Sequence, residues 1–263
     1  MGWLDRIGRR PDSTPAIGDR LAVALDAVER GDYATALDIW GPLAHAGVAR
    51  AQSNIGACFA EGLGVERDLA LAVKWLTLAA EGGDAIGRRN LAALYFRGEG
   101  VAEDYARAAE LYRAAAEAGD APAMDMLSWM LLEGEVMPPE PAEARRWSLA
   151  AAELGVPAAM TRLGMIYHNA LGVERDPATA VEWWRKAALL GDADGQAMLG
   201  AAQFLGAGIA RDGVAALAWL LRARAGGSQL ADPFIVAARN ALSAKEVTAA
   251  ERRATAKLEE AAP

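Results

Sequence analysis

The sequence has 263 residues, 53% of them hydrophobic and 24% charged, which is enough for a folded core and too apolar for a disordered chain. Its net charge of −8 argues against a general nucleic-acid binder, because phosphate binding depends on clustered Lys and Arg. A single cysteine, Cys58, and two histidines, His45 and His168, exclude an internal disulfide and a zinc site. We therefore expect no metal and no cofactor.

Residues 1–17 form a short segment ahead of the longer helical patterns. Trp3, Leu4 and Ile7 fall on one face of a short basic amphipathic helix. Two interpretations stay open, a weak peripheral membrane contact through Trp3 and a terminus that docks or frays. No apolar run reaches the roughly 18 residues of a transmembrane helix, and the first residues lack the apolar core of a signal peptide. These features predict a cytoplasmic location.

Residues 18–48 predict a pair of capping helices at the N-terminal end. Asp32, Ala34, Ala36 and Gly47 align with the second half of a unit that recurs later in the chain, but the connecting turn is shortened to Arg-Gly-Asp. Terminal units of this kind shield a stack of repeats from water.

A unit of 36 residues recurs five times between residues 49 and 228. A small residue stands near the start of each copy, at Ala51, Gly87, Ala123, Ala159 and Gly195. A closing glycine keeps the same spacing, at Gly83, Gly119, Gly155, Gly191 and Gly227. This register divides the chain into repeats at residues 49–84, 85–120, 121–156, 157–192 and 193–228.

The apolar spacing within each unit predicts two amphipathic helices joined by a tight turn. Ala51, Ile55 and Phe59 have the spacing of one helical face, and similar patterns follow in the second half of each unit. Aspartates stand where the helices begin and are expected to cap them, at Asp68, Asp104, Asp176 and Asp212 for second helices and at Asp84, Asp120 and Asp192 for first helices. The closing glycines are expected to end the second helices in a left-handed conformation.

Small and aromatic positions predict how the helices pack. Gly56 and Gly164 are expected to let two helix backbones approach closely. One large apolar position per repeat is expected to fill the space between neighbouring repeats, at Trp75, Leu111, Trp147, Trp183 and Trp219. A packing role for this row is favoured over a cofactor site.

The third copy and the C-terminal end depart from the pattern. Pro138 and Pro139 stiffen the turn of the third copy, and Glu140 replaces the capping aspartate. This loop is either a docking point or a tolerated variation. Residues 229–263 predict C-terminal capping helices, with Ser243 and Glu246 forming a capping box.

Residues 49–84, ARAQSNIGACFAEGLGVERDLALAVKWLTLAAEGGD, resemble the Sel1-like repeat, a branch of the tetratricopeptide superfamily. The resemblance covers all five copies and implies an all-α fold, a right-handed α-solenoid of helix-turn-helix repeats. Family members are known mainly as adaptors and scaffolds that hold other proteins. The resemblance therefore implies a non-catalytic binding function for this chain.

By the same resemblance, the first helices line a concave groove, and their variable positions are candidates for partner binding. The candidates are Asn54, Arg89, Asn90, Arg97, Trp129, Arg162 and Asn169. Asparagines can bond a peptide backbone and arginines can hold a carboxylate, whereas Trp129 suits an apolar side chain. We expect a protein or peptide partner with an acidic portion and an apolar anchor.

Two other classes of function stay open. The chain could self-assemble or tether a structure to a membrane, and it is expected to be a monomer or a weak homo-oligomer. A hydrolase-type enzyme is less favoured, because no Ser, Cys or acid stands at a spacing that completes a catalytic set with His168.

Overall fold

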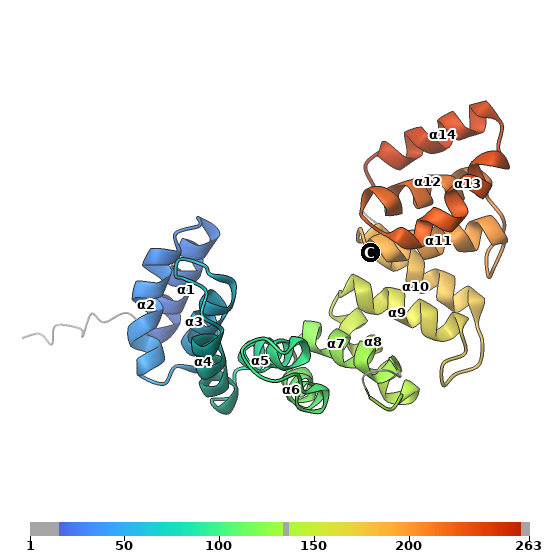
Figure 1. Cartoon of the computed structure of the whole chain (residues 1–263). Coiled ribbons are helices and arrows are strands. Elements are labelled where there is room, and N and C mark those ends of the chain that lie inside the picture. The colour runs from blue at the N-terminus through green and yellow to red at the C-terminus, as the bar shows by residue number, and fades with distance from the viewer. Residues whose placement is uncertain (1–15, 134–136, 259–263) are drawn as a thin grey trace, which may run out of the picture. The chain divides into compact units, whose positions relative to one another are not determined.

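A computed structural model describes residues 16–133 and 137–258 (Figure 1). Within these ranges the chain forms fourteen α-helices, one short 3₁₀-helix and no strand. The all-α prediction, a solenoid of helix pairs with a period of 36, is confirmed. The predicted amphipathic segment with Trp3, Leu4 and Ile7 falls almost wholly outside the described residues.

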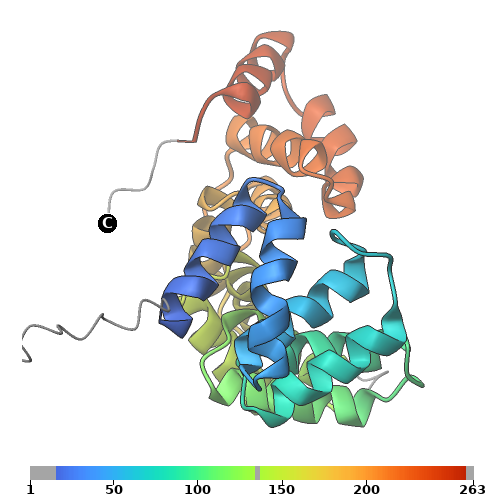
Figure 2. The same ribbon diagram turned by 90° about the vertical axis from the view of Figure 1, so that its left-hand side faces the viewer.

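The chain divides into two compact units, residues 1–111 and 112–263, with the boundary inside α6. The first unit holds α1 (Ile17–Glu29), α2 (Tyr33–His45), α3 (Ala49–Glu61), α4 (Leu69–Glu81) and α5 (Ala85–Arg97). Helix α6 spans Tyr105–Glu117. The second unit holds α7 (Ala121–Leu132), α8 (Pro141–Glu153), α9 (Pro157–His168), α10 (Pro177–Leu189), α11 (Ala193–Leu205), α12 (Gly213–Ala225), η2 (Gln229–Ala231), α13 (Asp232–Asn240) and α14 (Ala244–Thr255). Figure 2 shows α1 and α2, in blue, side by side as one such pair.

The turn inside each repeat is closed by one backbone hydrogen bond that recurs in all five copies. The residue before each second helix donates its N–H to a carbonyl near the end of the first helix, in the pairs Asp68–Phe59, Asp104–Tyr95, Glu140–Leu131, Asp176–Tyr167 and Asp212–Gln203. The four aspartates also accept from the first turn of the second helix, as predicted. Glu140 makes no such side-chain bond, yet its backbone bond is 2.8 Å long, so the third copy keeps the turn without the cap.

The five closing glycines all have the left-handed backbone that the sequence predicts. Their φ angles run from 84° to 93°, a region that residues with a Cβ rarely adopt. Asp84, Asp120 and Asp192 follow three of these glycines and accept a hydrogen bond from the first turn of the next helix. A left-handed residue followed by a cap therefore turns the chain from one repeat into the next.

Packing within a repeat depends on the residue directly after the predicted aromatic row. Leu76 and Trp184 are fully buried against Gly56 and Gly164, where a Cβ would lie 2.6 Å and 2.2 Å from their side chains. At Gly56 the backbone nitrogen of Leu76 also lies near, 3.2 Å from the position of a Cβ, whereas at Gly164 the glycine makes room for an indole and not for a second backbone. In the predicted row itself, Leu111 and Trp147 are buried, and Trp75, Trp183 and Trp219 are half-buried. In every repeat the residue directly after this row is the more deeply buried of the two.

Both ends of the repeat array carry extra helices. Helices α1 and α2 pack their apolar residues against α3, with Trp40 only 3% exposed. At the other end α12, α13 and α14 share one cluster around Leu217 and Ile235. The predicted capping box is present, because Ser243 accepts from the backbone of Glu246 and Glu246 accepts from that of Ser243. These helices cover the apolar faces of the first and last repeats.

Candidate functional site

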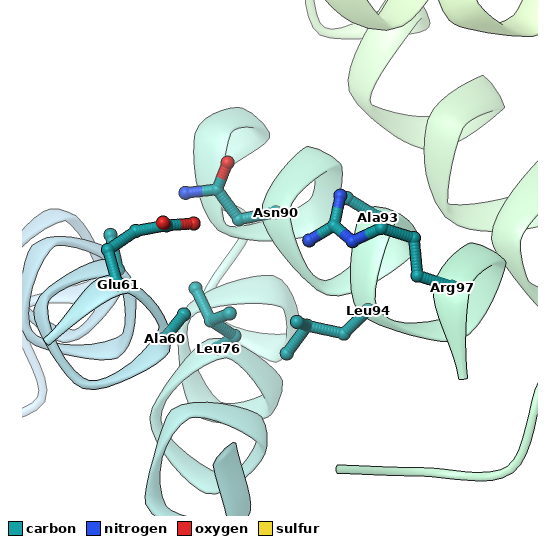
Figure 3. Close-up of a pocket in the computed structure, with 8 residues that line it drawn as sticks. Ala60, Glu61, Leu76, Asn90, Ala93, Leu94 and Arg97 are labelled. Carbon is teal, nitrogen blue, oxygen red and sulfur yellow. The ribbon is translucent and has the colours of Figure 1, made fainter. Parts of the chain in front are cut away.

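The predicted groove positions line a hollow in each unit. In the first unit the hollow lies between α3 and α5 and has a volume of about 240 Å³. We call it the N-terminal hollow. It is lined by Ala57, Ala60, Glu61, Leu76, Asn90, Ala93, Leu94 and Arg97. In Figure 3 the polar ends of Glu61, Asn90 and Arg97 lie around its opening, and Leu76 and Leu94 lie on the opposite side. Two of the predicted residues, Asn90 and Arg97, therefore share one site.

The charge of Arg97 is already compensated. Its Nε donates a 3.0 Å hydrogen bond to Glu99, which also lies 3.6 Å from the guanidinium of Arg67 in the preceding turn. Because the Arg97 side chain is 47% exposed, this pair is weak and a competing carboxylate could replace it. The N-terminal hollow thus offers an amide and an exchangeable arginine over a small apolar floor.

In the second unit the equivalent positions line a larger hollow of about 420 Å³. We call it the C-terminal hollow. It is lined by Trp129, Leu132, Glu133, Ala158, Thr161, Arg162, Met165, Leu171, Asp192, Asp194 and Leu230. The 36-residue register places Trp129 and Met165 where the first two repeats have Ala57 and Ala93. Large apolar side chains therefore replace alanines at the same place on successive first helices. Met165 is 40% exposed and Leu230 47%, so the apolar surface is open to a ligand.

Arg162 is held by an ion pair inside the second unit. Its Nη2 donates to Asp125 at 3.0 Å, and the two side chains are only 16% and 14% exposed. The register explains the contact, because Asp125 on α7 and Arg162 on α9 are 37 residues apart and α7 contacts α9. Arg162 brings a guanidinium to the hollow, but Asp125 already compensates its charge.

Three predicted site residues lie apart from both hollows. Asn54 is half-buried on α3, and its Nδ2 is screened from solvent with no partner among the described residues. Arg89 is half-buried on α5, and Asn169 is exposed where α9 ends. The structure therefore groups Asn90 with Arg97 and Trp129 with Arg162, and leaves the other three outside these groups.

The sequence interpretation missed Asp194 and Leu230 in the C-terminal hollow. Asp194 lies in the first turn of α11, where its Oδ1 accepts a 2.6 Å hydrogen bond from Ser228. The register could have revealed it, since Asp194 occupies the position of Arg50 in the first repeat. Leu230 belongs to η2, beyond the last repeat, and no periodic signal marks it.

His168, considered above as a catalytic candidate, is a packing residue. Its ring lies 5.4 Å from that of Trp184, and its Nδ1 is screened from solvent without a partner among the described residues. Burial, and then the nearby charge of Arg175, lowers the pKa of His168 below its ordinary value. Within the described ranges, no three His, Cys, Asp or Glu side chains are grouped as a metal site would require, and no helix is long and apolar enough to cross a membrane.

Comparison with known proteins gives the family. The family model described as the Sel1 repeat matches residues 49–84, 85–120, 121–156, 157–192 and 193–228. The chain belongs to the Sel1 repeat family. These boundaries agree with the 36-residue register, so the sequence period corresponds to the Sel1 unit.

Solved structures of Sel1 repeat proteins are similar to this chain. A Sel1 repeat protein from Oxalobacter formigenes has 27% identity and a TM-score of 0.80, over 93% of this chain and 99% of that one. A Sel1 repeat protein from Klebsiella pneumoniae subsp. pneumoniae has 24% identity and a TM-score of 0.50, over 76% of this chain and 97% of that one. No curated protein matches the chain. Sel1 repeats generally form non-enzymatic scaffolds for protein interaction, and this is the class of function to which the fold belongs.

Proposed function

We propose that this Sel1 repeat protein is a non-catalytic adaptor whose C-terminal hollow holds an apolar side chain of a partner peptide or helix. The observation that supports this proposal is the joint placement of Trp129 and Met165 in one open hollow, with Leu230 beside them. Partly exposed aromatic and methionine side chains are frequent anchors of protein interfaces. The volume of about 420 Å³ exceeds that of one large side chain and suits a short segment of chain.

Peptide selection with a matched pair of variants tests the proposal. Met165 on α9 and Leu149 on α8 are both 40% exposed, but only Met165 lines the hollow. Peptides selected from a displayed random library against the wild type should bind Met165→Glu at least about 10-fold more weakly, about 1.4 kcal/mol, and should bind Leu149→Glu as before. Equal binding to Met165→Glu would overturn the proposed site.

Self-assembly is the competing use of the same surface. Light scattering over a range of concentrations should give a monomer or a weak oligomer whose mass does not change with Met165→Glu. A stable dimer that Met165→Glu dissociates would assign the C-terminal hollow to a second copy of the chain instead of a peptide partner.

We also infer that the protein works in the cytoplasm. The support is Cys58, the single cysteine of the chain, which is buried as a free thiol and takes no part in a structural disulfide. Fractionation of cells that express the protein at its natural level should place it with cytoplasmic markers, and recovery in a membrane fraction would contradict this inference.

A further inference from the structure

The charges around the C-terminal hollow are one-sided. Its lining contains the carboxylates of Glu133, Asp192 and Asp194 against the single cation of Arg162. That cation is bonded to Asp125, which lies outside the lining. The surface that surrounds the apolar side chains is therefore negative.

The three carboxylates differ in how far the protein satisfies them. Oδ1 of Asp192 accepts from the backbone of Gly195 and from the hydroxyl of Thr161, both at 2.6 Å. Asp192 also caps the N-terminus of α11, whose partial positive charge offsets its own. Asp192 is half-buried and its Oδ1 is committed to the fold, so it has less capacity for a ligand than an exposed carboxylate.

Asp194 and Glu133 retain capacity to bind a donor. Both side chains are exposed. Asp194 has one hydrogen bond, from the neutral Ser228, and Glu133 has no ion pair with any residue in the described ranges. A carboxylate has two oxygens and room for about four donors, so each can accept from an incoming ammonium or guanidinium group.

The repeat register shows that the charge of Asp194 is particular to the C-terminal hollow, whereas Glu133 has a counterpart in Glu61 of the N-terminal hollow. In the first repeat the position of Asp194 is held by Arg50, which bonds the capping carboxylate of Asp84 at 2.6 Å. In the fifth repeat this position on the first helix is Asp194, and the capping residue that it contacts is the neutral Ser228. The contact between these two positions therefore pairs opposite charges in the first repeat. In the fifth repeat it joins a carboxylate to a hydroxyl and leaves a net negative charge.

Building on the function proposed above, we propose that the peptide bound in the C-terminal hollow carries a lysine or arginine close to its apolar anchor. The apolar side chain lies among Trp129, Met165 and Leu230, and the cation meets Glu133 or Asp194 at the rim. Arg162 does not present an uncompensated positive charge here, because its Nη2 is paired with Asp125 and its Nε, which has no partner among the described residues, is screened from solvent. The acidic portion predicted from the sequence would have to bind elsewhere.

Synthetic peptides test this choice of partner chemistry. The probes are fluorescein-labelled peptides of about ten residues in a Gly/Ser background, each with one Leu, Phe or Trp anchor and with Arg, Gln or Glu two to four residues away. Fluorescence anisotropy should give the order Arg, then Gln, then Glu, with about a 10-fold difference between the extremes at about 50 mM salt. The difference should shrink at about 500 mM salt, where surface charges are screened.

Two charge-matched double variants identify the carboxylates. Glu133→Gln with Asp194→Asn should remove the preference for arginine while the Gln peptides bind as before. Glu153→Gln with Glu182→Gln changes the net charge equally at exposed sites on α8 and α10 and should keep the preference. A preference for arginine that survives the first double variant would overturn the assignment to these carboxylates.

The outcomes separate this inference from the proposed function on which it rests. If Glu peptides bind as tightly as Arg peptides while Met165→Glu still weakens the Gln peptides, the basic partner is overturned and the hollow remains a binding site. Binding of the Gln peptides that does not change with Met165→Glu, or no binding by any peptide of the series, would overturn both.

Discussion

The guanidinium of Arg50 on α3 donates a 2.6 Å hydrogen bond to the carboxylate of Asp84, the residue that caps α5. The other oxygen of Asp84 accepts from the backbone of Gly87 at 2.7 Å. The Asp84 side chain is 6% exposed and that of Arg50 is 44% exposed. One buried carboxylate therefore ends a turn, starts a helix and joins two consecutive repeats.

We predict that Asp84→Ala lowers the free energy of unfolding by about 2 kcal/mol, because it removes a helix cap and leaves backbone donors without their partner. Asp84→Asn keeps a capping oxygen and should lose about half as much. Arg50→Gln should cost less than about 1 kcal/mol, because the arginine is 44% exposed and water screens its charge. Urea unfolding followed by circular dichroism measures all three. If Arg50→Gln lowers the free energy of unfolding as much as Asp84→Ala does, the ion pair and not the helix cap dominates the contribution of Asp84.

A second prediction concerns the contact between Gly164 and Trp184. A Cβ at Gly164 would lie 2.2 Å from Nε1 of Trp184, which is 1% exposed and donates to the Thr161 carbonyl at 3.2 Å. Gly164→Ala should therefore destabilise the second unit by about 2–3 kcal/mol, since the indole has to move out of a packed site. Chemical denaturation followed by tryptophan fluorescence measures the loss.

Gly41 provides the control for this substitution. It lies inside α2, and a Cβ there meets no atom within 4 Å. Gly41→Ala should raise stability by about 0.5–1 kcal/mol, because alanine has the higher helix propensity. Equal effects of the two substitutions would refute the packing argument.

The repeat frame was readable from the sequence because its determinants are local. A left-handed glycine such as Gly83 and a cap such as Asp84 act within one turn of backbone, so their spacing alone reports the structure. The sequence does not show that Leu76 is more deeply buried than Trp75, because the two residues are adjacent and both fit the apolar spacing of the helix. Which of them enters the core depends on the direction of the neighbouring helix, and here Leu76 packs on Gly56.

The sequence predicted only part of the candidate site, for a different reason. The register correctly brings Trp129 and Met165 to one surface, because positions 36 residues apart recur on successive first helices. The state of Arg162 depends on a long side chain that reaches Asp125 in the preceding repeat, and no periodic signal gives the reach of a side chain. Leu230 escapes prediction because it follows the last repeat, in the cap.

A third prediction uses Cys58 as a probe of the first unit. The thiol is 3% exposed, and burial raises its pKa to about 11. At pH 8 the folded protein should contain very little thiolate, the form that reacts with disulfide reagents. Labelling by Ellman's reagent should therefore be slow in native buffer and complete in seconds to minutes in about 6 M urea. Rapid labelling of the native protein at pH 8 would contradict the burial of this thiol.

The fourth prediction is a loss of stability in the second unit as the pH falls from 7 to about 5. The folded-state pKa of His168 lies below its ordinary value near 6.5, mainly because of burial, so the folded state favours the neutral ring. The resulting stability is present above the unfolded pKa and is lost as the pH falls through the folded pKa. Glu143, Asp176 and Glu246 also have lowered pKa values, but their contributions are lost mainly below this window, as the pH falls below their ordinary values of 4.5, 3.8 and 4.5.

Two histidine variants isolate the cause of this loss. His168→Phe keeps an aromatic ring against Trp184 and should flatten the dependence of unfolding free energy on pH between 7 and 5. His45→Gln replaces the exposed histidine of α2, the other histidine in the sequence, and should leave the dependence in place. Guanidinium titrations at several pH values provide the measurement. A wild-type slope that persists in His168→Phe would assign the loss to carboxylates instead, because histidine protonation at position 168 could then no longer account for it.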